Sequence, residues 1–157
     1  MKALVVYHSF FGNTQKIAEA IGKSMGSIPV LKVADVKGDD LLHLDYLVVG
    51  SPTRAFQPSP EITRLLKAIP PGRLKSTRVA AFDTRMAIEE VNVGILKFFA
   101  RILGFAAKPI ANLLVRKGGT LAVPPEGFFV KASEGPLKEG ELERATAWAK
   151  QIISTGK

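Results

Sequence analysis

The 157-residue chain contains no cysteine, which excludes disulfide bonds, thiolate metal sites, iron–sulfur clusters and a cysteine nucleophile. It has only two histidines, His8 and His43, so we expect no histidine metal site. No apolar run is long enough to span a bilayer, and no signal-peptide cleavage pattern follows the first apolar segment. With 46% apolar residues, the composition predicts one globular domain over residues 1–157, located in the cytoplasm.

Acidic residues are scarce, with 14 Asp and Glu against 22 Lys and Arg, and the shortage is confined to the middle of the chain. Residues 64–117 carry eleven basic and three acidic side chains, whereas residues 1–63 and 118–157 are each balanced. This asymmetry favours a basic face for an acidic partner or an anionic membrane surface. A generally basic, solvated surface explains it equally well. Nucleic-acid-binding motifs are absent, so a nucleic-acid partner is not favoured.

Apolar strand-like runs alternate with amphipathic helical patterns along the chain. The predicted strands cover residues 3–8, 29–33, 45–50, 78–82 and 119–123, the last interrupted at Pro124 and Pro125 and resumed at 128–130. The predicted helices cover residues 14–25, 62–69 and 141–153, the last with Leu142, Ala145, Ala149 and Ile152 facing inward. Continuous apolar strands separated by helices predict an α/β fold with a doubly wound, five-stranded parallel sheet.

Ligands of such a sheet bind beyond the carboxyl ends of its strands, at the point where the strand order reverses. The segments that follow the first, third and fourth strands are Ser9–Thr14, Ser51–Gln57 and Asp83–Met86. In the first, Gly12 and short polar side chains precede a helix, whose free amides and dipole attract a phosphate. No Walker A or Gly-x-Gly-x-x-Gly pattern follows a predicted strand, so a single terminal phosphate fits better than a dinucleotide.

Two of these segments resemble known flavin loops. Ser9-x-x-Gly12-Asn13-Thr14 resembles the phosphate loop of flavodoxins, and Pro52-Thr53-Arg54 resembles the second flavin loop of the flavodoxin-like superfamily. The resemblance implies the sheet order 2-1-3-4-5 with helices on both faces, and FMN as the cofactor. The FMN-binding residues that it implies are Ser9, Phe10, Phe11, Gly12, Asn13, Thr14, Pro52, Thr53, Arg54, Ala55, Phe56, Asp83, Thr84, Arg85 and Met86.

The chain departs from the flavodoxin pattern at the aromatic positions. Phe10 and Phe11 stand where flavodoxins usually have hydroxyl groups, so phosphate binding would depend more on backbone amides. The segment 83–86 lacks the tyrosine that typically covers the flavin. Phe56 is the only aromatic residue of the second loop, and its ring either stacks on the isoalloxazine or fills the core.

Flavodoxins are usually strongly acidic, whereas this chain has a net charge of +8. An arginine such as Arg54 or Arg85 within ~6 Å of the reduced flavin would stabilise it by about 3 kcal/mol at an effective dielectric near 20. That is on the order of 100 mV for one electron. We therefore expect a higher reduction potential than that of an acidic flavodoxin.

Residues 95–107 show a helical pattern that is apolar around most of its circumference, and Pro109 is expected to break or kink this helix. Such a helix either buries a second face against a homodimer partner, another protein or a membrane surface, or is covered by neighbouring loops of its own chain.

The resemblance implies an FMN electron carrier that transfers electrons between a reductase and an acceptor, with no catalytic residue of its own. Two other redox functions stay open. One is an FMN-dependent NAD(P)H:quinone reductase, suggested by the Pro52-Thr53-Arg54 similarity and by the apolar Phe10, Phe11 and Phe56. The other is a flavodoxin-like protoporphyrinogen oxidase, whose porphyrin carboxylates would suit the basic residues of the helical segment. A non-redox binding module that keeps only the fold is a further alternative.

Overall fold

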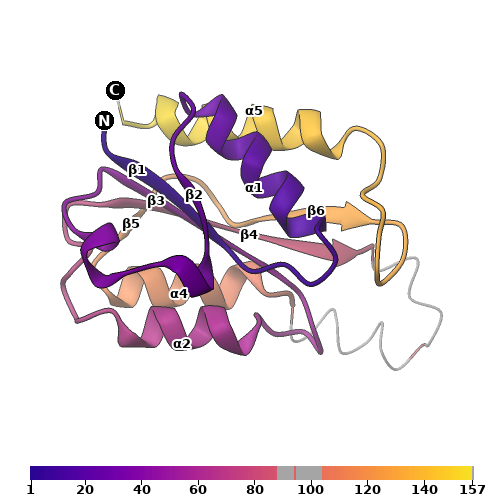
Figure 1. Cartoon of the computed structure of the whole chain (residues 1–157), viewed down its shortest axis with the longest axis horizontal. Coiled ribbons are helices and arrows are strands. Elements are labelled where there is room, and N and C mark those ends of the chain that lie inside the picture. Colours follow the sequence, from indigo (N-terminus) through magenta and orange to yellow (C-terminus); the bar gives the residue numbers. More distant parts are fainter. Residues whose placement is uncertain (88–93, 95–103, 157) are drawn as a thin grey trace.

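A parallel β-sheet forms the centre of the protein, which we describe from a computed structural model for residues 1–87, 94 and 104–156 (Figure 1). The strands are β1 (Ala3–Tyr7), β2 (Val30–Lys32), β3 (Tyr46–Pro52), β4 (Arg78–Met86), β5 (Thr120–Leu121) and β6 (Glu126–Val130). The order is β2-β1-β3-β4-β5, with β6 also paired to β4, and all pairings between these strands are parallel. The predicted doubly wound sheet and its order are confirmed.

The fifth strand of the sheet is present as two short pieces. β5 pairs with the first residues of β4, from Arg78, and β6 pairs with its last residues, up to Met86. Between the two pieces lie Pro124 and Pro125, which lack the amide hydrogen that strand pairing needs. The interruption and resumption predicted from the sequence are therefore confirmed.

Helices cover both faces of the sheet. They are α1 (Asn13–Ser24), α2 (Pro60–Ala68), α4 (Ala107–Arg116) and α5 (Glu141–Ser154), with two 3₁₀ turns, η1 (Val33–Asp35) and η2 (Gly38–Leu41). α1 and α5 cover one face, and α2 and α4 cover the other (Figure 1).

The expectation that Pro109 would break a helix is wrong. α4 begins at Ala107, so Pro109 lies in its first turn, where a missing amide hydrogen costs nothing because that turn has no intrahelical acceptor. Most of the apolar helix predicted for residues 95–107 lies outside the described residues.

Three aromatic rings fill the core between the sheet and the α1/α5 layer. Phe82, Phe128 and Trp148 contact one another edge to face, with ring centroids 6.0–6.1 Å apart. Each such contact adds about 0.5–1.5 kcal/mol beyond the burial of its area. Gly50 of β3 provides the space, because a Cβ atom there would lie 2.0 Å from the ring of Phe82. The core position predicted for Trp148 is confirmed, with 4% of the residue exposed.

The predicted inward position of Leu142 is wrong, since this residue is 42% exposed. Glu141 is buried instead, and its carboxylate accepts hydrogen bonds from the Phe129 amide (2.7 Å) and from Arg144 (2.7 and 2.9 Å). Burial alone would raise the pKa of Glu141, but the hydrogen bonds from Arg144 and Phe129 reverse this and lower it. The hydrogen bonds of the Glu141 carboxylate therefore connect the first turn of α5 to β6.

Candidate flavin site at the carboxyl edge of the sheet

The three predicted loops meet where β1, β3 and β4 end. The sheet order reverses between β1 and β3, because β2 and β3 lie on opposite sides of β1. The Oγ1 atoms of Thr14 and Thr84 lie 2.8 Å apart, which joins the first loop to the third. The amide of Thr53 donates to the carbonyl oxygen of Thr84 at 3.0 Å, which joins the second loop to the third. Thr84 thus connects all three segments.

The first loop turns sharply at Gly12. This residue has φ +90°, in the left-handed region that glycine favours, and its amide donates to Ser9 Oγ at 2.9 Å. The space around Gly12 is open, because a Cβ atom there would have no neighbour within 4 Å. The glycine is therefore required for its backbone conformation.

Backbone amides without acceptors surround this turn. Within the described part of the chain, no hydrogen bond engages the amides of Phe10, Phe11, Asn13, Thr14 and Gln15. No acidic residue occupies the first turn of α1, and no side chain caps it. Free amides at the positive end of a helix dipole are the donors that a phosphate group prefers.

The Phe10 and Phe11 side chains leave these amides accessible, because they project outward and are 45% and 50% exposed. The hydroxyl oxygen of Ser9 accepts a hydrogen bond from the Gly12 amide, so its own proton can still be donated to a ligand. The hydroxyl of Thr14 is buried and bonds to that of Thr84. The backbone is thus the main source of donors in this loop.

Asn13 is held by a turn that sequence reasoning did not assign to the site. Its Nδ2 donates to the carbonyl oxygen of Glu134 at 3.1 Å. Gly135 has φ +103°, and a Cβ atom there would lie 2.6 Å from the Asn13 amide group, so only glycine fits. A glycine after Glu134 was the one signal in the sequence that marks this close approach.

The second loop contains a strained turn. Arg54 and Gln57 exchange two backbone hydrogen bonds, of 3.0 and 2.9 Å, and enclose Ala55 and Phe56. Both enclosed residues have positive φ, 48° and 65°, although neither is glycine. Each such residue costs on the order of 1 kcal/mol or more, and strain of this kind is concentrated at functional sites. The half-buried Phe56 lies at the tip of this turn.

Arg54 reaches from the second loop to the first. Its guanidinium carbon lies 4.7 Å from the ring centroid of Phe10, and His8 packs against the same ring with centroids 4.6 Å apart. His8 Nδ1 also lies 3.3 Å from Glu61 Oε2, within ion-pair distance but without hydrogen-bond geometry. The exposed charge of Arg54 is thereby positioned beside the free amides.

The third segment is not a loop. Residues 83–86 are the last four residues of β4, so the strand boundary predicted at residue 82 is wrong. The fully buried Asp83 forms a two-pronged ion pair with Arg85, at 2.6 and 2.7 Å, and accepts from the Ala107 amide at 2.9 Å. Burial raises the pKa of Asp83, while Arg85 and the Ala107 amide oppose that rise.

Arg85 is enclosed by further contacts. Its guanidinium lies 4.0 Å from the ring centroid of Phe105, and a Cβ atom at Gly127 would lie 2.1 Å from its Nε. Because its charge is paired with Asp83, Arg85 is not the free cation that sequence reasoning considered near the flavin. Of the two arginines, only Arg54 is exposed.

Comparison with known proteins identifies the family. Residues 4–119 match the model of the flavodoxin domain. The chain belongs to the flavodoxin domain family. Members of this family bind FMN as their cofactor. No curated protein sequence matches the chain.

Several solved flavodoxins share the fold. A flavodoxin from the domain Archaea is 24% identical, with both chains covered completely and a TM-score of 0.70. The flavodoxin of Streptococcus pneumoniae TIGR4 is 16% identical, with 98% of this chain and 99% of that chain covered and a TM-score of 0.75. Flavodoxin 1 from Bacillus cereus is 13% identical, with 98% of each chain covered and a TM-score of 0.74.

The residues of this chain fit FMN at the phosphate end of the cofactor in particular. The free amides around Gly12 are donors of the kind that a terminal phosphate accepts. The described residues include no cluster of His, Asp and Glu that would hold a metal ion. Among the same residues, no helix has the length and apolar character needed to cross a membrane.

Proposed function

We propose that this flavodoxin is an FMN electron carrier that accepts electrons from a reductase and passes them to an acceptor. The observation that carries the proposal is the set of free amides on either side of Gly12, at the point where the sheet order reverses. Bound FMN supplies the redox chemistry, and the chain supplies binding and electrostatics.

Each loop then has a separate task. The amides around Gly12 hold the phosphate, and Ser9 adds a hydroxyl donor. The Thr14–Thr84 hydrogen bond keeps this loop at a fixed distance from β4. Phe56, at the tip of the strained turn, is the aromatic residue of the second loop that we expect to cover the flavin ring. The side chains of Asp83 and Arg85 bind each other, so contacts to FMN from β4 are expected from Thr84, Met86 and the backbone.

Arg54 sets the expected direction of the redox potential. It is the arginine of the flavin loops whose charge is exposed, and stacking on Phe10 holds it at the site. A positive charge close to the flavin favours the reduced, anionic cofactor. We therefore propose that this protein operates at a higher potential than acidic flavodoxins.

A second candidate is an FMN-dependent NAD(P)H:quinone reductase. The observation that favours it is the apolar rim formed by Phe10 and Phe11 of the phosphate loop, each of which is about half exposed. Flat apolar acceptors bind readily to such rings.

Mixing the FMN-loaded protein with NADH or NADPH under nitrogen separates the two functions. A carrier keeps its flavin absorbance near 450 nm until a separate flavin reductase is added. A quinone reductase loses this absorbance with NAD(P)H alone and regains it when benzoquinone is added. Rapid bleaching without a reductase would overturn the carrier proposal and support the second candidate.

A further inference from the structure

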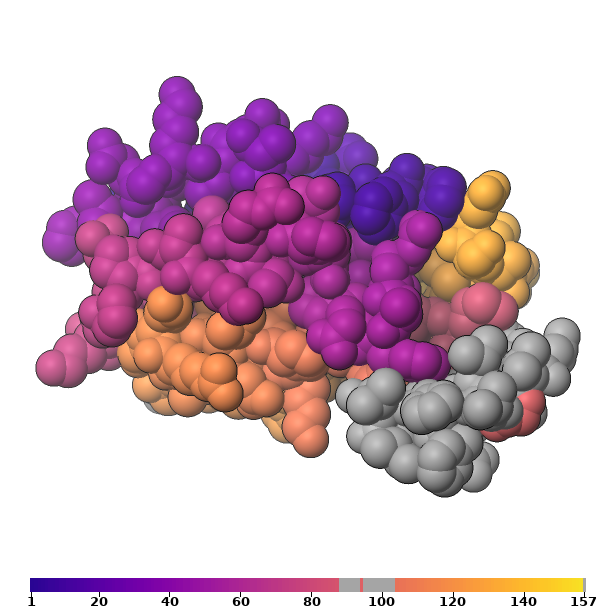
Figure 2. Space-filling model, turned by 90° about the horizontal axis from the view of Figure 1, so that it is seen from below, coloured from indigo at the N-terminus to yellow at the C-terminus, as the bar shows by residue number. Residues whose placement is uncertain are grey.

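Two segments of the chain together carry a charge equal to its whole net charge. We call the surface that they form the basic face: residues 62–82 and 104–125, which include most of α2, all of α4, the buried start of β4 and the strand β5. These residues contain no Asp or Glu and eight cations: Arg64, Lys67, Arg73, Lys75, Arg78, Lys108, Arg116 and Lys117. The net charge of the chain is also +8. Figure 2 shows this side, with α2 in magenta beside α4 in orange.

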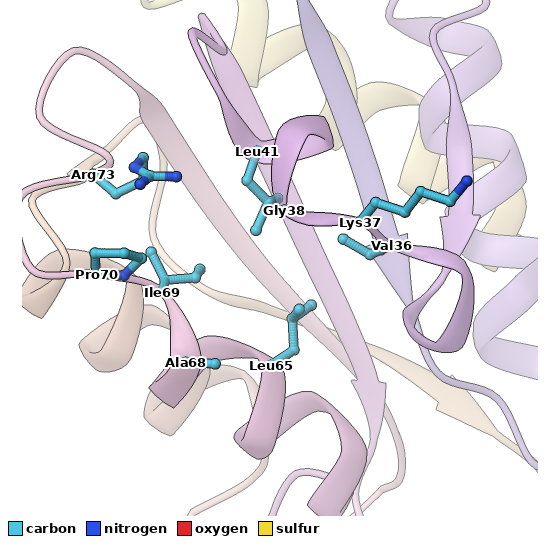
Figure 3. Close-up of a pocket in the computed structure, with 9 residues that line it drawn as sticks. All are labelled: Val36, Lys37, Gly38, Leu41, Leu65, Ala68, Ile69, Pro70 and Arg73. Atoms are coloured by element: carbon cyan, nitrogen blue, oxygen red, sulfur yellow. The ribbon is translucent and has the colours of Figure 1, made fainter.

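An apolar pocket opens at one end of the basic face. It has a volume of about 220 Å³ and lies between η2 and the carboxyl end of α2 (Figure 3). The buried side chains of Leu41 and Ile69 form its base. Arg73 stands at its rim, whereas the side chain of Lys37 extends away from it. The wall is completed by Val36, Gly38, Leu65, Ala68 and Pro70.

A second, wider hollow of about 500 Å³ adjoins the pocket. Arg73 lines both, so the two form one groove with this arginine in the middle. The hollow is lined by residues 42–45 and 75–77, which precede and begin the strands β3 and β4. The groove is therefore at the amino edge of the sheet. The seven residues of β3 separate it from the flavin loops, a distance of roughly 20 Å.

The size of the pocket limits its occupant. The apolar pocket, at about 220 Å³, is smaller than the volume of about 300–1,000 Å³ that is usual for cofactor and drug-sized sites, so only a small apolar group can enter it. It is large enough for one bulky side chain, the kind of anchor that holds most protein interfaces together.

The charge around the groove selects the chemistry of that occupant. Within the described residues, neither Arg73 nor Lys75 has an ion-pair partner. The neighbouring carboxylates of Asp40 and Asp45 accept hydrogen bonds from the amides of Lys37 (2.7 Å) and Lys2 (2.8 Å), and Asp45 also lines the wider hollow. Because neither carboxylate forms an ion pair with Arg73 or Lys75, the two cations can contact a negatively charged partner.

We propose that this groove docks an acidic segment of a partner protein, with one bulky apolar side chain in the pocket and carboxylates against Arg73 and Lys75. A polypeptide satisfies both parts of the groove, because it carries an apolar anchor and flanking charges at fixed spacing. Docking at the amino edge leaves the flavin edge accessible. The inference does not depend on the redox role proposed above.

The test uses the FMN-loaded, full-length protein and a fluorescein-labelled peptide of twelve residues, with one central phenylalanine between runs of glutamate. Anisotropy at low salt measures binding, and amide NMR shifts identify the residues contacted. We expect saturable binding, with shifts at residues 36–41 and 65–77. Replacing the phenylalanine of the peptide by serine should weaken binding about tenfold, or about 1.4 kcal/mol.

Two variants test the groove, each with a control of equal charge change on the opposite face. Arg73→Glu is compared with Lys150→Glu, and Ala68→Glu with Ala147→Glu; both control positions are exposed residues of α5. We expect the groove variants to weaken binding at least about tenfold and the controls less than about threefold. The flavin spectrum of all four should be unchanged.

Three results would overturn the proposal. The first is no saturable binding of the peptide at millimolar concentration. The second is equal weakening by the groove variants and their controls, which would mean that only net charge matters. The third is that phosphatidylglycerol vesicles or single-stranded DNA bind more tightly than the peptide, and that Arg73→Glu weakens their binding to the same extent. That result would assign the groove to a membrane or a nucleic acid.

Discussion

The buried ion pair at the end of β4 gives a quantitative prediction of stability. Asp83 is fully buried, and Arg85 approaches both of its carboxylate oxygens, at 2.6 and 2.7 Å. Replacing Arg85 by methionine removes the guanidinium that stacks on Phe105 and leaves the buried charge of Asp83 without its partner. Breaking one side of such a pair costs about 3–5 kcal/mol, so Arg85→Met should lower the free energy of unfolding by that amount.

Urea unfolding of the FMN-free protein measures this loss without a contribution from cofactor binding. The matched control is the double variant Asp83→Asn, Arg85→Met, in which no charge remains and the amide side chain still accepts from Ala107. We expect the double variant to be more stable than Arg85→Met alone.

The pH dependence gives a second check of the same reasoning. Burial raises the pKa of Asp83, and removal of Arg85 eliminates the main opposing interaction. A carboxyl group with a raised pKa takes up its proton in the folded state first, so folding stability falls as pH rises above the unfolded value of about 3.9. The loss caused by Arg85→Met should therefore be smaller at pH 5 than at pH 8. A loss below about 1 kcal/mol at both values would refute the argument, because that is the size expected of an exposed pair.

Two further predictions concern α5 and the second loop. Glu141→Gln should reduce the loss of folding stability at acid pH. The lowered pKa of Glu141 contributes stability above about pH 4.3, and this stability is lost as the pH falls through the pKa of the folded state. An unchanged dependence of the free energy of unfolding on acid pH, measured by urea unfolding, would contradict this. Arg54→Gln should lower the midpoint potential of the last one-electron reduction of bound FMN by tens of millivolts, measured by dye-equilibrated redox titration. The control Arg64→Gln, on an exposed position of α2, should change the potential much less, and equal shifts would show that the effect of Arg54 is not local.

The spacing of apolar residues along the chain was sufficient to predict the sheet. The apolar runs 3–8, 45–50 and 78–82 have no polar alternation, which is typical of strands buried on both faces, and all three lie in the middle of the observed sheet. The two prolines after residue 123 were sufficient to predict the break in the fifth strand. These features are local, so the sequence contains them directly.

The errors at the end of β4 and at the start of α5 have a common physical cause: a charged side chain is buried because it is paired with other residues of the fold. β4 extends to Met86 because Asp83 has partners in Arg85 and in the distant Ala107. Glu141 displaces Leu142 from the inward position because Arg144 and Phe129 compensate its charge. A polar side chain is normally assigned to the surface, and only the folded structure shows that its charge is satisfied.

The contribution of Glu134 and Gly135 to the first loop was beyond sequence reasoning for a similar reason. Asn13 contacts this turn across more than a hundred residues of chain. Gly12, by contrast, was identified from its place between a strand and a helix, and its positive φ agrees with that interpretation.

The most direct test of the account compares FMN with riboflavin, which lacks the phosphate, in titrations of the cofactor-free protein followed by flavin fluorescence. If the free amides of Phe10, Phe11 and the first turn of α1 hold the phosphate, FMN should bind saturably, one per chain, with its fluorescence quenched. Hydrogen bonds to a charged group contribute about 1.5–3 kcal/mol each, so two of them make riboflavin at least about a hundredfold weaker. Equal affinity for the two flavins, or no saturable binding of FMN, would contradict the central claim.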